Sequence, residues 1–112
     1  MVMEKTKVNF LGTYAEGWAT GDAQKILGAA APGFVFTDPN GSVARDAFAG
    51  YHAKFVEQYG SAMALSGVVA YEVGDRLVAC CVWEARSLKG TGLIVVGAEG
   101  VEREDVVLLY SV

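Results

Sequence analysis

A carboxylate at the end of an apolar strand is the side chain of this sequence best suited to chemistry. Asp38 follows the run Phe34-Val35-Phe36-Thr37 and precedes Pro39-Asn40-Gly41. An acid beside apolar side chains is either solvated at the strand edge or faces an apolar cavity, where loss of water favours its neutral form. In a cavity, Asp38 can act as a general base that takes and returns a proton. At the strand edge, it begins the turn and bonds backbone N–H groups two or three residues on.

Two further side chains are catalytic candidates beside Asp38. Tyr14 lies on the apolar face of a predicted helix, where its hydroxyl either reaches the surface or a backbone carbonyl, or donates to a developing enolate oxygen in a cavity. His52 is the single histidine, and histidine is the side chain that ordinarily titrates nearest neutrality. An inward-facing His52 would be an alternative base or donor, and otherwise it is a core or surface histidine.

Aromatic side chains are the candidates for binding a flat, apolar ligand. Trp18 lies one helical turn after Tyr14, so it either stacks on a ligand or is the largest core residue of its helix. We predict that four aromatic residues line the pocket: Trp18, Phe36, Phe55 and Trp83.

The composition narrows the class of protein. The chain has 112 residues, 53% of them hydrophobic, which fits one domain over 1–112 whose apolar excess lines a cavity or an oligomer interface. With 13 acidic against 9 basic residues and no basic cluster, nucleic acid is not an expected partner. No apolar run reaches the roughly 18 to 20 residues of a membrane span, and no apolar signal core follows the N-terminus, so we expect a cytoplasmic protein.

Neither a metal nor a cofactor is expected. His52 has no cysteine or second histidine at ligand spacing from it. The two cysteines, Cys80 and Cys81, are adjacent in a predicted strand, so their side chains point to opposite faces and cannot readily form a disulfide. We interpret both as buried small hydrophobic residues. The same alternation puts Cys81 and Trp83 on one face of the strand.

The candidates are positioned by three helices and a sheet. Apolar residues at three- and four-residue steps predict helices over 5–19 and 23–31, and a third from a cap at Ser42 or Asp46 to residue 59. A strand ends at Asp38, and four more are predicted over 62–73, 76–87, 91–98 and 106–112. We interpret the acidic stretch 102–105 as a solvated turn or the start of the last strand rather than as a binding site. This order predicts an α+β fold, with a strongly curved antiparallel or mixed sheet wrapped around three N-terminal helices.

The sequence resembles the NTF2-like superfamily, and within it the SnoaL-like and ketosteroid-isomerase-like group. The resemblance lies in the element order, in Tyr14, in Trp18 with Gly21-Asp22, and in Phe36-Thr37-Asp38-Pro39-x-Gly41. It implies a cone-shaped α+β barrel. In ketosteroid isomerases the first-helix tyrosine donates to the oxyanion and the acid of the Asp-Pro turn shuttles the proton, which implies these roles for Tyr14 and Asp38. A second, neutral carboxylic acid also donates there, and its position falls at about Gly92 in this chain.

Two functions follow as expectations. One is a cofactor-independent isomerase, cyclase or lyase acting on a small, apolar carbonyl compound, with Asp38 as general base and Tyr14 as oxyanion donor. The other, favoured by the missing second acid, is a non-catalytic module that binds a hydrophobic ligand or dimerises. For either function we expect a homodimer through the outer sheet face, which carries apolar residues such as Val69, Tyr71, Val82 or Val107.

Overall fold

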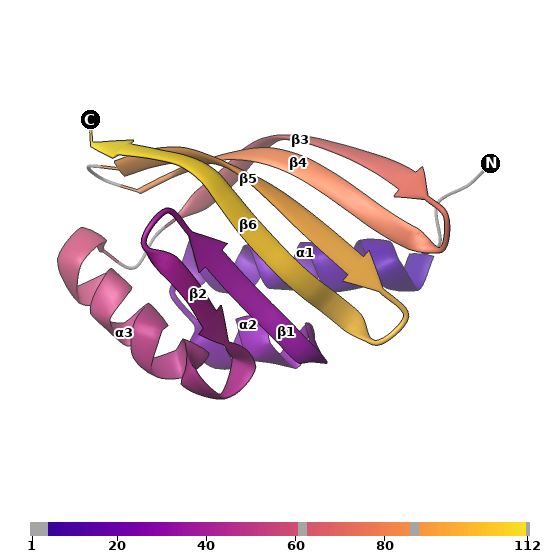
Figure 1. Ribbon diagram of the computed structural model, residues 1–112, viewed down its shortest axis with the longest axis horizontal. Coiled ribbons are helices and arrows are strands. Elements are labelled where there is room, and N and C mark those ends of the chain that lie inside the picture. The colour runs from indigo at the N-terminus through magenta and orange to yellow at the C-terminus, as the bar shows by residue number, and fades with distance from the viewer. Residues whose placement is uncertain (1–4, 61–62, 86–87, 112) are drawn as a thin grey trace.

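Three helices lie on one face of a curved sheet (Figure 1). This computed structural model describes residues 5–60, 63–85 and 88–111. The helices are α1 (Lys5–Thr20), α2 (Ala23–Gly28) and α3 (Phe48–Tyr59), the last preceded by a 3-10 turn, Arg45–Ala47. The strands are β1 (Ala30–Asp38), β2 (Gly41–Ala44), β3 (Ala64–Val73), β4 (Arg76–Glu84), β5 (Leu88–Gly97) and β6 (Gly100–Ser111).

The sheet is mixed and open. Its strand order is β2-β1-β6-β5-β4-β3, with β1 parallel to β6 and every other pair antiparallel. The predicted α+β class and curved, mixed sheet around three helices are therefore confirmed. The sheet does not close into a barrel over the described residues, because β2 and β3 remain its two edges.

The segment around the first strand departs from the sequence prediction. Helix α2 ends at Gly28, and Ala30 and Ala31 already belong to β1, so the predicted helix over 23–31 was too long. After Asp38 the chain reverses through Pro39 and Asn40, and Asp38 pairs with Gly41 to start β2, which was not predicted. The residue that precedes α3 is Ala47, without a side-chain cap, so neither Ser42 nor Asp46 caps that helix.

The last two strands begin earlier than predicted. Strand β5 starts at Leu88, and β6 starts at Gly100, so the acidic stretch 102–105 lies within β6. The prediction that this stretch starts the last strand is confirmed, but Glu104 is fully buried rather than solvated. The predicted strand ends at residues 62, 87 and 112 lie outside the described residues.

An aromatic cluster fills the space between the helices and the sheet. Trp18 of α1 is at its centre, with ring centroids 5.5 Å from Phe36, 5.2 Å from His52 and 6.2 Å from Trp83. The largest buried aromatic side chains are Tyr14, Trp18, Phe34, Phe36, Phe48 and Trp83. Burying a large aromatic side chain contributes roughly 1.5–3 kcal/mol, so this cluster is a main source of the fold's stability.

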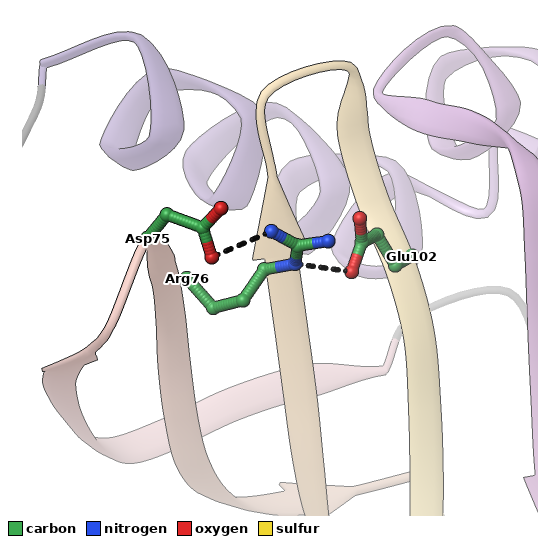
Figure 2. A network of polar contacts seen from close by, with 3 residues as sticks. All are labelled: Asp75, Arg76 and Glu102. Atoms are coloured by element: carbon green, nitrogen blue, oxygen red, sulfur yellow. Dashed lines mark hydrogen bonds and ion pairs between the residues drawn. The ribbon is translucent and has the colours of Figure 1, made fainter.

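Three charged residues, Asp75, Arg76 and Glu102, form a network at one end of the sheet that we call the charged clamp (Figure 2). Arg76 of β4 donates from Nε to Glu102 of β6 at 2.7 Å and from Nη1 to Asp75 at 2.7 Å. The clamp crosses β5 at Gly97, where a Cβ would collide with the Glu102 carboxylate. Because all three charged groups are partly exposed, the clamp contributes little to stability, and its acids are occupied by Arg76.

The contact between α1 and α2 gives a sharp stability prediction. A Cβ on Gly17 would lie 2.6 Å from Ile26 Cγ1 and 2.8 Å from the Ile26 backbone nitrogen, whereas one on Gly12 meets nothing within 4 Å. We expect Gly17→Ala to lower the free energy of unfolding by about 1–3 kcal/mol through overpacking. The matched Gly12→Ala variant is expected to raise it by about 0.5–1 kcal/mol, since alanine favours a helix. Urea unfolding of both variants tests this, and equal effects would contradict it.

Candidate functional site

Asp38 lies at the end of β1 with both carboxylate oxygens hydrogen bonded. The backbone N–H of Asn40 donates to Oδ1 at 2.8 Å, which is the local turn bond considered from the sequence. The hydroxyl of Tyr51, on α3, donates to Oδ2 at 2.8 Å. Each oxygen keeps a second lone pair, so these bonds leave the carboxylate able to accept a proton or hydrogen bond from a ligand.

Asp38 forms one wall of a groove of about 250 Å³. The groove is also lined by the aromatic face of α3, where Tyr51, Phe55 and Tyr59 follow at four-residue steps. Neighbouring rings on this face have centroids 6.3 Å and 4.8 Å apart. The lining residues are Asp38, Asn40, Tyr51, Lys54, Phe55, Gln58 and Tyr59. The groove combines an acceptor, aromatic walls and one ammonium group, which suits a small flat molecule.

His52 faces the interior but not this groove. It is 3% exposed, and its ring packs against Trp18 and against Phe48, with centroids 5.2 Å and 5.8 Å apart. Burial lowers the pKa of His52, and the charge of Asp22 opposes this only in part. The imidazole is therefore neutral near pH 7, in keeping with the core interpretation considered from the sequence.

Tyr14 belongs to a second polar site, deep in the core. It is fully buried, and its hydroxyl donates to Oε1 of Glu104 on β6. The indole N–H of Trp83, on β4, donates to Oε2 of the same carboxyl group at 3.0 Å. The carboxyl group thus joins one helix and two strands, and it is the one acid that is fully buried among the described residues.

Burial controls the protonation of this pair. It raises the pKa of Glu104 from 4.5 to about 7, although the hydrogen bonds from Tyr14 and Trp83 oppose the shift. Burial and the adjacent Glu104 carboxylate raise the pKa of Tyr14 well above its usual value. Near neutral pH the tyrosine is therefore a hydroxyl donor, and Glu104 is present in both its neutral and its charged form.

The Glu104 carboxyl group lies beside Gly92, the position at which the sequence lacks an acid. A Cβ placed on Gly92 of β5 would lie 3.3 Å from Oε2 of Glu104. The Glu104 carboxyl group, on the neighbouring strand, therefore lies next to the space that a side chain at position 92 would fill. Sequence reasoning missed Glu104 because it lies in a run of charged residues. Counting back two residues from the buried Val106 would have placed it on the inner face, since side chains alternate along a strand.

One buried donor near this site has no partner. The Trp18 indole is close enough to Tyr14 to favour the ionised form of the tyrosine, yet Nε1 of Trp18 makes no hydrogen bond of acceptable geometry among the described residues. An unpaired buried N–H group costs roughly 1–3 kcal/mol, which a ligand oxygen would recover.

The structure brings some of the predicted residues together and separates others. Trp18, Phe36, Phe55 and Trp83 are mutually packed in the core, and Phe55 also lines the groove. Asp38 and Tyr14 do not meet. They are linked only through other side chains. Tyr51 bonds to Asp38, packed aromatic rings connect Tyr51 with Trp83, and Glu104 bonds to both Trp83 and Tyr14.

The described part of the chain contains neither a cluster of metal-ligating side chains nor a membrane-spanning helix. Within residues 5–60, 63–85 and 88–111, no three His, Cys, Asp or Glu side chains gather in a group that could hold a metal ion. No helix in that part of the chain has the length and apolar character to cross a membrane. Cys81 is buried and burial raises the pKa of its thiol to about 12, whereas Cys80 is exposed on the outer sheet face, not buried as expected.

The architecture is shared with solved structures of low sequence identity. No protein-family model matches the sequence, and no curated protein is similar enough in sequence to count as a relative. TerC, crystallised with polyporic acid, is 17% identical with a TM-score of 0.72, covering 91% of this chain and 90% of TerC. A Xanthomonas campestris pv. campestris protein provisionally named a polyketide cyclase is 18% identical with a TM-score of 0.71, covering 93% of this chain and 90% of its own.

A third structure names the fold directly. An NTF2-like protein of unknown function from Cytophaga hutchinsonii is 12% identical with a TM-score of 0.67, covering 100% of this chain and 95% of its own. At these identities the likeness concerns the backbone architecture and does not extend to activity. This chain has the NTF2-like fold.

Proposed function

We propose that this protein binds a small, flat, mostly apolar carbonyl compound and moves a proton on it, with Asp38 as general base. The observation that carries the proposal is the Asp38 carboxylate in the wall of an aromatic groove, held by two hydrogen bonds. TerC, which shares the fold, was crystallised with polyporic acid. In the reaction, Asp38 removes a hydrogen from the carbon beside the carbonyl, the C–H electrons move to form an enolate, and the proton is then returned to carbon.

Tyr14 is the oxyanion donor in this proposal, and Glu104 is its partner. A carbonyl oxygen that reached the interior would accept from the unpaired Trp18 N–H and from the Tyr14 hydroxyl, which would turn to it from Glu104, while neutral Glu104 could donate in turn to the Tyr14 oxygen. One such donor typically contributes on the order of 10² to 10³ in rate. Phe55 lines the groove and packs on Trp83, which binds Glu104, so the ligand enters by displacing Phe55.

The proposal is tested without knowledge of the natural substrate. The probe is 2-tetralone, a flat bicyclic ketone whose C1 hydrogens are acidic because they lie between a ring and a carbonyl. In D₂O, NMR should show that the protein exchanges these hydrogens faster than acetate at the same concentration, since a positioned base exceeds a free one. Exchange no faster than with acetate would contradict proton transfer.

A second function, a ligand-binding or dimerising module, is supported by the filled core. The aromatic side chains between Asp38 and Tyr14 occupy the space that a ligand would need to reach both. In that case the groove alone binds the ligand and Tyr14 with Glu104 holds the fold together. A protein that binds 2-tetralone without exchanging its hydrogens would favour this function.

We also propose that the protein forms a homodimer through the outer sheet face. The four residues expected there are exposed: Val69, Tyr71, Val82 and Val107, at 49%, 55%, 39% and 70%. Val82 and Val107 line an apolar hollow of about 430 Å³ together with Gly67, Gly92 and Cys80. A contiguous exposed apolar surface of this kind marks an interface.

A matched pair of valines tests the dimer. Val107→Asp introduces a charge on the outer sheet face, and Val8→Asp introduces the same charge at an exposed valine of α1. Sedimentation at micromolar concentration should show a dimer for the parent protein and for Val8→Asp, and a monomer for Val107→Asp. A monomeric parent protein would refute the dimer.

A further inference from the structure

We propose that Tyr51 is the positioning residue of the base, because its hydroxyl fixes which face of the Asp38 carboxylate is presented to the groove. The inference rests on the proposed function, in which Asp38 receives the proton. Tyr51 was not among the residues singled out in the sequence. It lies on α3, thirteen residues after Asp38, and it reaches Asp38 only because α3 packs beside the end of β1.

The carboxylate needs such a constraint. The terminal torsion of an aspartate side chain is broad, so one hydrogen bond leaves the carboxylate free to tilt. The Asn40 backbone N–H holds Oδ1 at 2.8 Å and the Tyr51 hydroxyl holds Oδ2 at 2.8 Å. The first donor comes from the turn and the second from the helix, so together they fix the plane of the carboxylate between two elements.

Tyr51 is itself held firmly. Its ring packs against Phe36 of β1 with centroids 5.3 Å apart, and against Phe48 and Phe55 on its own helix at 6.1 Å and 6.3 Å. Packing on three neighbours leaves the ring little rotational freedom, so the hydroxyl is pre-positioned before a ligand arrives. The orientation of the base on β1 is therefore set by α3.

The hydroxyl of Tyr51 remains protonated, and so a donor, near neutral pH. Burial, followed by the hydrogen bond to Asp38 and the charges of Asp38, Glu104 and Tyr59, raises the pKa of Tyr51 above its usual value. Lys54 is the cation that lines the same groove. A neutral tyrosine hydroxyl donates a hydrogen bond to Asp38 and does not itself take up the proton that Asp38 removes from the ligand.

Two tyrosine variants test the role. Tyr51→Phe removes the hydroxyl bonded to Asp38, and Tyr71→Phe removes the hydroxyl of an exposed tyrosine on β3, outside the residues that line the groove. For exchange of 2-tetralone, we expect Tyr51→Phe to lower kcat by about 10²-fold, as a misplaced catalytic group does, and to leave KM nearly unchanged. Tyr71→Phe should leave kcat nearly unchanged. A kcat in Tyr51→Phe equal to that in Tyr71→Phe would overturn the inference.

A second measurement decides the matter even if the parent protein exchanges nothing. In a crystal structure of Tyr51→Phe, the Asp38 carboxylate should be rotated away from its present plane, with the bond from Asn40 retained. A carboxylate in the same plane would overturn the positioning role. If the parent protein exchanges none of the 2-tetralone hydrogens, proton transfer is refuted. The positioning role of Tyr51 is then decided by whether the Asp38 carboxylate is rotated in the crystal structure of Tyr51→Phe.

Discussion

The Asp38→Asn variant is expected to exchange the C1 hydrogens of 2-tetralone about 10²- to 10⁴-fold more slowly than the parent protein. An amide has nearly the shape of a carboxylate: its oxygen can still accept the bond from Asn40 and its nitrogen can donate to the Tyr51 oxygen, but it cannot accept a proton near neutral pH. The variant should therefore fold and bind while losing the base. The measurement is the exchange rate by NMR in D₂O at saturating ketone.

The control for this variant is Asp46→Asn. Asp46 is an exposed acid of the 3-10 turn before α3, outside the residues that line the groove. Its replacement removes the same charge from the same region of the sequence and should leave the exchange rate unchanged. Equal rates in Asp38→Asn and the parent protein would show that the exchange takes place at another group, and Asp38 would be left with its turn role.

The second large effect concerns the pH dependence of stability. The folded-state pKa of Glu104 is raised from 4.5 to about 7, so between these values the folded protein binds a proton that the unfolded chain does not. This contribution is fully present below pH 4.5 and is lost as the pH rises through about 7. The shift corresponds to roughly 3 kcal/mol of unfolding free energy, since each pKa unit is about 1.4 kcal/mol.

Glu104→Gln isolates this contribution. The glutamine amide resembles the neutral carboxyl group, able to accept from Trp83 and to donate to the Tyr14 oxygen, and it does not titrate. Urea unfolding at pH 4.5 should give similar free energies for variant and parent, and at pH 8 the variant should be more stable by about 3 kcal/mol. Glu102→Gln, a less buried acid on the same strand, is the control. A difference that does not change with pH would contradict the assignment.

Much of the fold could be predicted because its signals are local. Three- and four-residue apolar steps define α1, and aromatic residues at the same steps define α3. Strand β2 escaped prediction because Gly41–Ala44 is only four residues long and carries a single large apolar side chain, Val43, so its pairing with β1 is not signalled by the sequence. The start of β6 was hidden for the opposite reason, since four charged residues in a row resemble a solvated turn.

The candidate site was predictable only in part. Asp38 is marked by its sequence neighbours, whereas its partner Tyr51 is set by how α3 packs on β1. Glu104 is ninety residues from Tyr14, and its burial follows from the register of β6 against β5, in which it pairs with the buried Ile94. That register includes irregularities. Alternation is therefore reliable only over short stretches of β6, and strict alternation along the whole strand does not predict that Glu104 faces the core.

In the proposed function, a ligand bound at the Asp38 groove also reaches the polar site in the core. The direct test is an NMR titration with 2-naphthol, a flat phenol, that follows the indole N–H signals of Trp18 and Trp83 and the backbone N–H of Asn40. We predict that all three shift together, with the largest change at the Trp18 N–H as it gains an acceptor. A shift at Asn40 with both indole signals unmoved would show a ligand confined to the groove and contradict the claim.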